Sequence, residues 1–201
     1  MKILSIGAHF DDIELHASAT LLKLQAEKGA ELYSIVCTNG LLGGGAGVEN
    51  RRNEQNAANE LLGIKESFYL NFADVTLLHT YSLVNPIDEI LMKIKPDMIF
   101  SHSENDINND HIAVAKAAKS VNRRFMSHLY GFPASDPKVK DSMNLYVDVT
   151  KYFKKKLEIL KCFTSQQYRD IFDTDFLEVQ HSSFIKGRYV ERFNADFMYW
   201  K

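Results

Sequence analysis

The feature that most constrains the fold of this chain is the regular alternation of short apolar runs with helical patterns. Runs rich in β-branched and aromatic residues, typical of strands, occur at residues 2–8, 32–38, 67–72, 97–102, 128–132 and 144–149. Repeated strand–helix units favour a parallel sheet covered by helices on both faces. We therefore predict a Rossmann-like, doubly wound α/β fold in which most strands run parallel.

The spacing of apolar residues predicts five helices, at residues 17–28, 50–63, 86–95, 110–119 and 150–162. The third has the clearest start, with Asn85 as N-cap and Pro86 as the first helical residue, where the missing N–H has no helical partner to lose. Asp110 is expected to cap the fourth helix.

Two longer connections remain between these elements, at residues 39–49 and 133–143. Loops of this length in α/β domains are commonly functional. For the first, which is rich in glycine, a plain flexible loop and a substrate lid both remain open. We expect both connections to form walls of the crevice in which a substrate would lie.

The composition indicates a single soluble domain over residues 1–201. A chain of 201 residues, 45% of them hydrophobic, can bury one sizeable core. Its 24 basic and 26 acidic residues give a formal net charge of −2, which provides no basic surface for nucleic acid. No apolar run approaches the roughly 20 residues of a membrane span. Generic nucleic-acid binding and membrane insertion are therefore not expected.

Two features favour a cytoplasmic location. The apolar run from Ile3 to Ala8 is short for a secretory signal, whose apolar region has roughly 7 to 15 residues. Cys37 and Cys162 lie far apart in the sequence and match no metal-binding spacing, as suits a reducing compartment. We expect both cysteines to be unpaired core residues.

Histidines and aspartates follow two of the predicted strands. His9, Asp11 and Asp12 come directly after the first strand, and the segment from His102 to His111 follows the fourth. In a doubly wound sheet, ligands bind beyond the carboxyl ends of the strands, where the strand order reverses. We expect the two clusters to meet in one crevice at that point.

The spacing within these clusters suits a catalytic zinc site, which takes about three protein ligands and leaves one position open. His9 and Asp12 are three residues apart, and His111, at the mouth of the fourth helix, faces the same crevice. Asp11, next to this site, is placed to act as a general base. A single histidine is often only structural, and aspartates after a strand often cap helices, so the metal site and the structural reading both remain open at this point.

The residues then resemble a known family. AHFDDIELHASATL at residues 8–21 is similar to the signature of the zinc-dependent de-N-acetylases called the LmbE-like or PIG-L family. Further matching pieces are TNG at 38–40, RRNEQNAANELLGI at 51–64, PDMIFSHSENDINNDHIAVAKA at 96–117, SQ at 165–166 and GRYVERF at 187–193. The likeness spans most of the chain, and the order and spacing of the pieces make it specific.

The resemblance implies roles for individual residues. His9, Asp12 and His111 would hold zinc or another divalent ion, and Asp11 would be the general base. Arg51 matches the family's arginine that contacts substrate. The substrate implied is an N-acetylated amino sugar of the N-acetylglucosamine type, from which the acetyl group is removed by a metal-activated water.

Some positions depart from the family's pattern. Phe10 replaces the usual proline, and Phe163 replaces a frequent histidine. Asn108 stands where many members have a second histidine, so it can donate a hydrogen bond to substrate or an oxyanion but no proton. Asp11 would then also protonate the leaving amine. His102 is expected to support Asp110 or His111 from outside the ligand set.

Two other functions remain open from the sequence. One keeps the metal but changes the reaction, as in a zinc-dependent hydratase or an amidase for a non-sugar substrate. The other is a non-catalytic Rossmann-like module that binds a sugar or nucleotide. The sequence also leaves the oligomeric state open, a homo-oligomer included.

Overall fold

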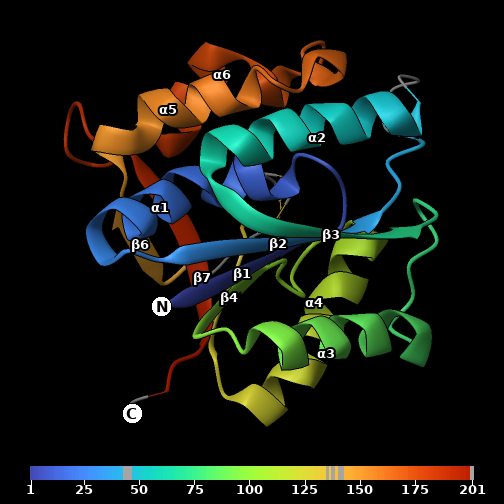
Figure 1. Ribbon diagram of the computed structural model, residues 1–201. Helices are drawn as coiled ribbons and strands as arrows, with labels where there is room; N and C mark the ends of the chain where they lie inside the picture. Colours follow the sequence, from blue (N-terminus) through green and yellow to red (C-terminus); the bar gives the residue numbers. More distant parts are fainter. Residues whose placement is uncertain (43–46, 135, 137–138, 140–142, 200–201) are drawn as a thin grey trace.

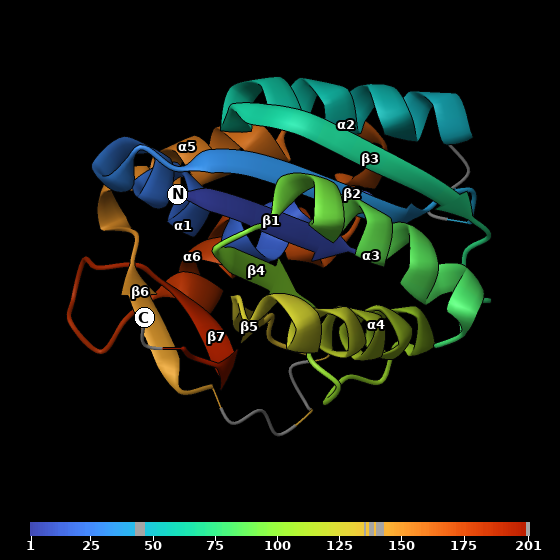
Figure 2. The ribbon, with the colours of Figure 1, turned by 60° about the horizontal axis from the view of Figure 1, so that its bottom comes forward.

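The order of the strands brings the ends of the first and fourth strands together at the centre of the sheet. The computed structural model describes residues 1–42, 47–134, 136, 139 and 143–199. Within these residues the sheet follows the order β3-β2-β1-β4-β5-β7-β6 (Figure 2). The strands are β1 (Lys2–Gly7), β2 (Glu31–Thr38), β3 (Ile64–Phe72), β4 (Met98–Ser101), β5 (His128–Gly131), β6 (Leu145–Asp148) and β7 (Val190–Phe197).

The first five strands pair in parallel, and β7 pairs antiparallel with both β5 and β6. The strand order reverses between β1 and β4, because β2 and β3 lie on one side of β1 and the later strands lie on the other. The predicted mostly parallel α/β fold is therefore confirmed.

Helices cover both faces of the sheet. They are α1 (Asp12–Lys28), α2 (Val48–Leu62), α3 (Tyr81–Ile94), α4 (Asn109–Phe125), α5 (Thr150–Leu160) and α6 (Thr174–His181). Helices α3 and α4 pack on one face, and α1, α2, α5 and α6 lie on the other (Figure 1). No helix in the described part of the chain is long and apolar enough to cross a membrane.

Strand β1 is buried on both sides because both faces of the sheet are covered. Ile3 packs into the core beneath α1, α2 and α5, whereas Leu4 and Ile6 pack into the core beneath α3 and α4. Alternate residues of a strand point to opposite faces. This explains why the first strand reads as a continuous apolar run.

The start of α3 corrects the sequence prediction. The helix begins at Tyr81 with Thr80 as N-cap, so Pro86 lies inside it and Asn85 is not the cap. Leu83, which is buried in the core, lies in the added first turn. We infer that this packing outweighs the backbone hydrogen bond that a proline inside a helix removes.

Two further helix starts differ from prediction. Helix α1 begins at Asp12, five residues earlier than expected. Helix α4 is capped by Asn108, whose side chain accepts a hydrogen bond from the backbone N–H of Asp110, so Asp110 is not the cap. Strand β7 and helix α6 were not among the predicted elements.

Candidate active site

Two strand ends bring His9 and His111 into contact. His9 lies two residues beyond the end of β1, and His111 lies in the first turn of α4, which follows β4. His9 Nδ1 is 3.2 Å from His111 Nε2. The crevice predicted at the reversal of strand order therefore contains both histidines, as expected.

The carboxylate of Asp12 completes a compact set of three possible metal ligands. One of its oxygens is 3.5 Å from His9 Nδ1, and the other is 3.6 Å from His111 Nε2. Ligand atoms about 2.0–2.1 Å from a tetrahedral ion lie about 3.4 Å from one another. The separations of 3.2 to 3.6 Å in this structure are close to that value.

Each histidine of this set has its other ring nitrogen on a carboxylate. His9 Nε2 lies 3.0 Å from Asp110 Oδ2, and His111 Nδ1 lies 2.9 Å from Asp106 Oδ2. Such carboxylates fix the orientation of metal-binding histidines and raise their basicity. A supporting position was expected for Asp110, but Asp106 was missed. The position of Asp106 in the run Asp106-Ile-Asn108-Asn-Asp110-His111 was the sequence signal that could have indicated this supporting role.

The charges around the set favour a cation at this position. Burial opposes protonation of His9, but its contacts with Asp110 and Asp12 outweigh burial and raise the pKa of His9 to about 10. Burial also opposes ionisation of Asp12, yet nearby His111 and His102 hold the pKa of its carboxyl well below its ordinary value. Carboxylates that stabilise an imidazolium at this point would equally stabilise a metal ion.

His102 lies behind the ligand set. Its Nε2 is 3.0 Å from Asp12 Oδ2 and from the backbone N of Ala8, and its ring stacks on that of His111 at 3.8 Å between centroids. Burial lowers the pKa of His102 to about 4, so the ring is neutral near pH 7. His102 thus supports Asp12 as well as His111, whereas Asp110 or His111 had been expected.

His102, Asp106 and His111 form a second group whose polar atoms lie close together. The rings of its two histidines are stacked, with 20° between their planes, so their in-plane lone pairs run side by side. Such lone pairs do not converge on one ion. The first group, with His9, is therefore the better candidate for a metal centre.

Asp11 occupies a strained turn next to the group of His9, Asp12 and His111. Its φ of 88° lies in the left-handed region, which non-glycine residues rarely adopt. Its side chain caps no helix, and the carboxylate instead faces the cavity. Burial, and then the charge of Asp12, raise the pKa of Asp11 to about 6, although Arg51 and Arg169 oppose the rise.

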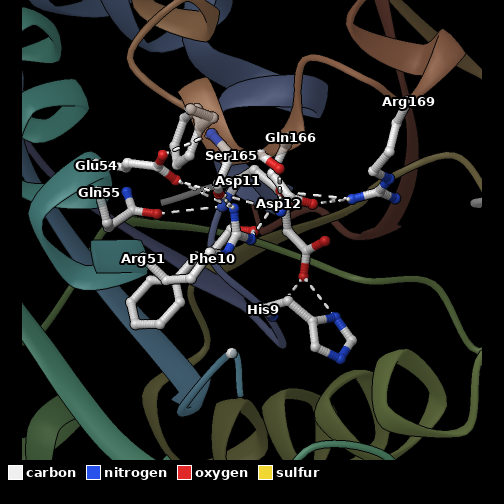
Figure 3. Close-up of polar contacts among 12 residues, drawn as sticks. His9, Phe10, Asp11, Asp12, Arg51, Glu54, Gln55, Ser165, Gln166 and Arg169 are labelled. Carbon is white, nitrogen blue, oxygen red and sulfur yellow. Dashed lines mark hydrogen bonds and ion pairs between the residues drawn. The ribbon is translucent and has the colours of Figure 1, made fainter. Parts of the chain in front are cut away.

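Arg51 binds Asp11 from inside the protein (Figure 3). Its Nη2 donates to Asp11 Oδ2 at 3.0 Å and to the carbonyl of Phe10 at 2.9 Å. Its Nη1 lies 3.5 Å from both Glu54 and Ser165. Because the side chain is 2% exposed, Arg51 presents little surface to a substrate. Its expected substrate contact stays a prediction.

Residues that the sequence did not single out surround this arginine. Glu54 accepts hydrogen bonds from the hydroxyl groups of Thr164 and Ser165 and from the backbone N–H of Ser165. Gln55 accepts from the backbone N–H of Asp11 at 3.2 Å. The segment after α5 is thereby joined to α2 beneath the site. The SQ pair at 165–166 was the available signal for this connection.

A cavity of about 950 Å³ opens above these residues. Described residues from both long connections line it, among them Gly40, Leu42, Pro133 and Met143, so both connections help wall the crevice. The parts of those connections at 43–46, 135, 137–138 and 140–142 lie outside the described residues. Asn108 also lines the cavity while capping α4.

Both cysteines are free, with Cys37 buried and Cys162 half-buried.

Comparison with known proteins finds a matching family and a related protein. Residues 4–122 match the model of the family described as "PIG-L: GlcNAc-PI de-N-acetylase". The chain is also 31% identical over 166 residues to the uncharacterized deacetylase YaiS of Escherichia coli strain K12. That alignment covers 79% of this chain and 88% of YaiS.

Two solved structures share the whole fold. The N,N'-diacetylchitobiose deacetylase from Pyrococcus horikoshii superposes with a TM-score of 0.82 at 23% identity, over 96% of this chain and 82% of that one. GalB from Pseudomonas putida, a 4-carboxy-2-hydroxymuconate hydratase, superposes with a TM-score of 0.83 at 18% identity, over 100% of this chain and 98% of that one. At these identities the likeness concerns the fold.

Proposed function

The chain belongs to the PIG-L family of de-N-acetylases, and from that premise we propose that it is a zinc-dependent hydrolase that removes the acetyl group from an N-acetylated amino sugar. Family membership makes it an amide hydrolase and disfavours a non-catalytic binding module. The observation that carries the proposal is the approach of His9, Asp12 and His111 to separations of 3.2 to 3.6 Å, next to the buried Asp11.

His9, Asp12 and His111 would hold the ion, because two imidazoles and one carboxylate are ligands that zinc prefers. When bound, such an ion lowers the pKa of water and stabilises the negative charge that develops on the amide carbonyl oxygen. Another divalent ion with the same preferences could take its place. Asp106 and Asp110 keep the two histidines oriented toward it.

Asp11 accepts the proton of the attacking water in this mechanism. A base with a pKa of about 6 is largely ionised at pH 7 and still accepts a proton as the transition state forms. The C–N bond of the amide then breaks, and the protonated Asp11 gives its proton to the departing amine nitrogen. The products are acetate and the free amino sugar. One residue thus serves as base and acid, which suits a site with Asn108 rather than a second histidine.

The assignment to an amino sugar rests on the family description and on the chitobiose deacetylase of the same fold. Asn108 lines the cavity, so its amide is placed to bind a sugar hydroxyl or the carbonyl oxygen. The cavity volume of about 950 Å³ is ample for a disaccharide-sized substrate.

The test combines elemental analysis of the purified protein with an acetate-release screen over N-acetylglucosamine, its glycosides and its phosphates. We expect one equivalent of a divalent metal and release of acetate. The GalB fold makes a hydratase the second candidate, so water addition to unsaturated dicarboxylic acids is assayed in parallel. Hydration without acetate release would overturn the proposal.

Two variants test the residue roles. Asp11→Ala should retain the metal and abolish turnover, because it removes the base but no ligand. His111→Ala should lower the metal content, because it removes a ligand. An Asp11→Ala protein that hydrolyses substrate near the wild-type rate would show that Asp11 is not the base.

A further inference from the structure

A second arginine, Arg169, contacts the carboxylate of Asp11 from the side of the cavity. Its Nη1 lies 3.5 Å from Asp11 Oδ2, whereas Arg51 Nη2 lies 3.0 Å from the same oxygen. The side chain of Arg169 is 41% exposed and that of Arg51 is 2% exposed. The two guanidinium groups approach Asp11 from opposite sides (Figure 3). Of these two cations, Arg169 is the one that a molecule entering the cavity can reach.

The chain around Arg169 fixes the direction of its side chain. Its backbone N–H donates to the carbonyl of Gln166 at 3.0 Å, and its own carbonyl accepts from the N–H of Phe172 at 2.9 Å. Its Nη1 donates to Gln166 Oε1 at 3.0 Å, and its guanidinium carbon lies 5.9 Å from the centre of the buried Phe172 ring. The guanidinium group of Arg169 is therefore held at the cavity wall before any ligand binds. This order reduces the conformational entropy that is lost on binding.

The acidic residues of the cavity wall are already engaged with other groups. Asp74 accepts hydrogen bonds from two backbone N–H groups, and Glu191 pairs with the buried Lys156 at 2.6 Å. Asp136 is not free either. Arg192 lines the same cavity, and its Nη2 donates a hydrogen bond to the carbonyl of Ser182 at 3.1 Å. Arg169 and Arg192 therefore give the wall beyond the metal site two guanidinium groups that line the cavity.

Resting on the proposed de-N-acetylase function, we propose that Arg169 binds an anionic substituent of the amino-sugar substrate, a carboxylate or a phosphate, while Arg51 positions Asp11. A guanidinium presents a planar fork of N–H donors that matches both anions with two parallel hydrogen bonds. The contact of Arg169 with Asp11 is longer than the contact of Arg51 with Asp11. The exposed edge of the Arg169 guanidinium faces the cavity. The substrate class is therefore an N-acetylated sugar acid or sugar phosphate rather than a neutral sugar.

The test compares kcat/KM for N-acetylglucosamine with kcat/KM for its 1-phosphate, its 6-phosphate and N-acetylmuramic acid. The measured quantity is kcat/KM for a charged substrate divided by kcat/KM for N-acetylglucosamine. Loss of the contact between Arg169 and Asp11 affects both values and therefore cancels in this ratio. Arg169→Gln should lower this ratio about 10-fold or more. The ratio for Arg169→Lys should lie between those of the wild type and Arg169→Gln, because lysine keeps the positive charge but lacks the two parallel N–H donors of the guanidinium group. Arg123→Gln, on the exposed end of α4, is the matched control and should leave the ratio unchanged.

Calorimetric titration with the same four compounds keeps this test separate from the test of the reaction. If acetate is not released from any compound, the proposed function fails, yet tighter binding of the anionic compounds by the wild type than by Arg169→Gln still supports the role of Arg169. An equal charged-to-neutral ratio in wild type and Arg169→Gln, or equal binding of all four compounds by both proteins, would overturn the inference. The three anionic compounds distinguish a phosphate from a carboxylate and one sugar position from another.

Discussion

Arg51 and Asp11 form an ion pair of 3.0 Å between side chains that are 2% and 4% exposed. The same Arg51 nitrogen also donates to the carbonyl of Phe10, so one guanidinium fixes both the backbone and the side chain of the turn after β1. That turn holds Asp11 at a φ of 88°. The pair therefore keeps the proposed base in place and offsets part of the strain in its backbone.

Replacing Arg51 by glutamine should therefore lower kcat while leaving the metal content unchanged. We expect a loss of about 10- to 100-fold in kcat, because the base loses the group that orients it. Steady-state kinetics and elemental analysis of the same sample measure the two effects. Arg52→Gln on the same helix is the control, since Arg52 contacts Tyr69 and Asn71 rather than Asp11. A wild-type kcat in Arg51→Gln would contradict the positioning role.

Removing the charge of Asp106 should weaken metal binding without removing a ligand. Asp106→Asn keeps the shape of the residue that holds His111 Nδ1 but replaces a carboxylate by a neutral amide. Such changes outside the ligand set lower metal affinity about 10- to 100-fold. Competition with a chromogenic chelator measures the affinity. Asp97→Asn, whose carboxylate accepts from the backbone of Lys2 away from the site, should show the wild-type affinity.

The sequence predicted the sheet well because its inner parallel strands, such as β1 and β2, are buried on both faces and read as continuous apolar runs. It missed β7, which lies between β5 and β6 in the sheet. Strand β7 is antiparallel and carries charged residues such as Glu191 and Arg192, so it has no apolar run to mark it. The start of α3 was wrong because Pro86 is an expected first residue, and only the packing of Leu83 shows that the helix begins earlier.

The site was predictable where its residues follow strands. His9, Asp12 and His111 were brought together by the topology, which fixes where parallel strands end. Arg169 was not predictable in this way, because it lies between two short 3-10 helices whose path depends on tertiary contacts. The inward position of Arg51 was predictable from helical spacing, because Arg51, Glu54, Ala58 and Leu62 recur along one stripe of α2, and all four are buried.

Gly40 is required by its contact with Phe10. A Cβ atom at Gly40 would lie 2.4 Å from the Phe10 ring, and the φ of 67° is unfavourable for other residues. Gly40→Ala should therefore destabilise the fold by about 1–3 kcal/mol and disturb the turn that carries Asp11. Chemical denaturation measures the loss. Gly29→Ala has a similar φ of 63° but open space around it, so the difference between the two variants isolates the steric contact. Equal losses would show that the contact with Phe10 is unimportant.

Breaking the buried pair of Lys156 and Glu191 should destabilise the fold strongly. Both side chains have no exposed surface, and Glu191 also accepts from the backbone N–H groups of Ala19 and Thr20 inside α1. Glu191→Gln leaves the ammonium group buried without a counter-charge, which costs about 3–5 kcal/mol. Urea denaturation gives the loss in the free energy of unfolding. Glu158→Gln breaks an exposed pair with Lys155 and should leave the free energy of unfolding nearly unchanged.

Acid should destabilise the protein partly through His181. Burial, and then the charge of Lys156, hold the pKa of His181 well below its ordinary value of 6.5, and its Nδ1 lies 2.8 Å from the carbonyl of Leu177. The folded protein therefore keeps this ring neutral, whereas the unfolded chain binds a proton below pH 6.5. The resulting stability is complete above pH 6.5 and is lost as the pH falls below it, by up to about 1.4 kcal/mol per pH unit. His181→Gln lacks the titrating ring, so the free energy of unfolding should fall less steeply in the variant between pH 6.5 and 4.5. Denaturation curves at several pH values measure both slopes, and identical slopes would show that His181 is not the group responsible.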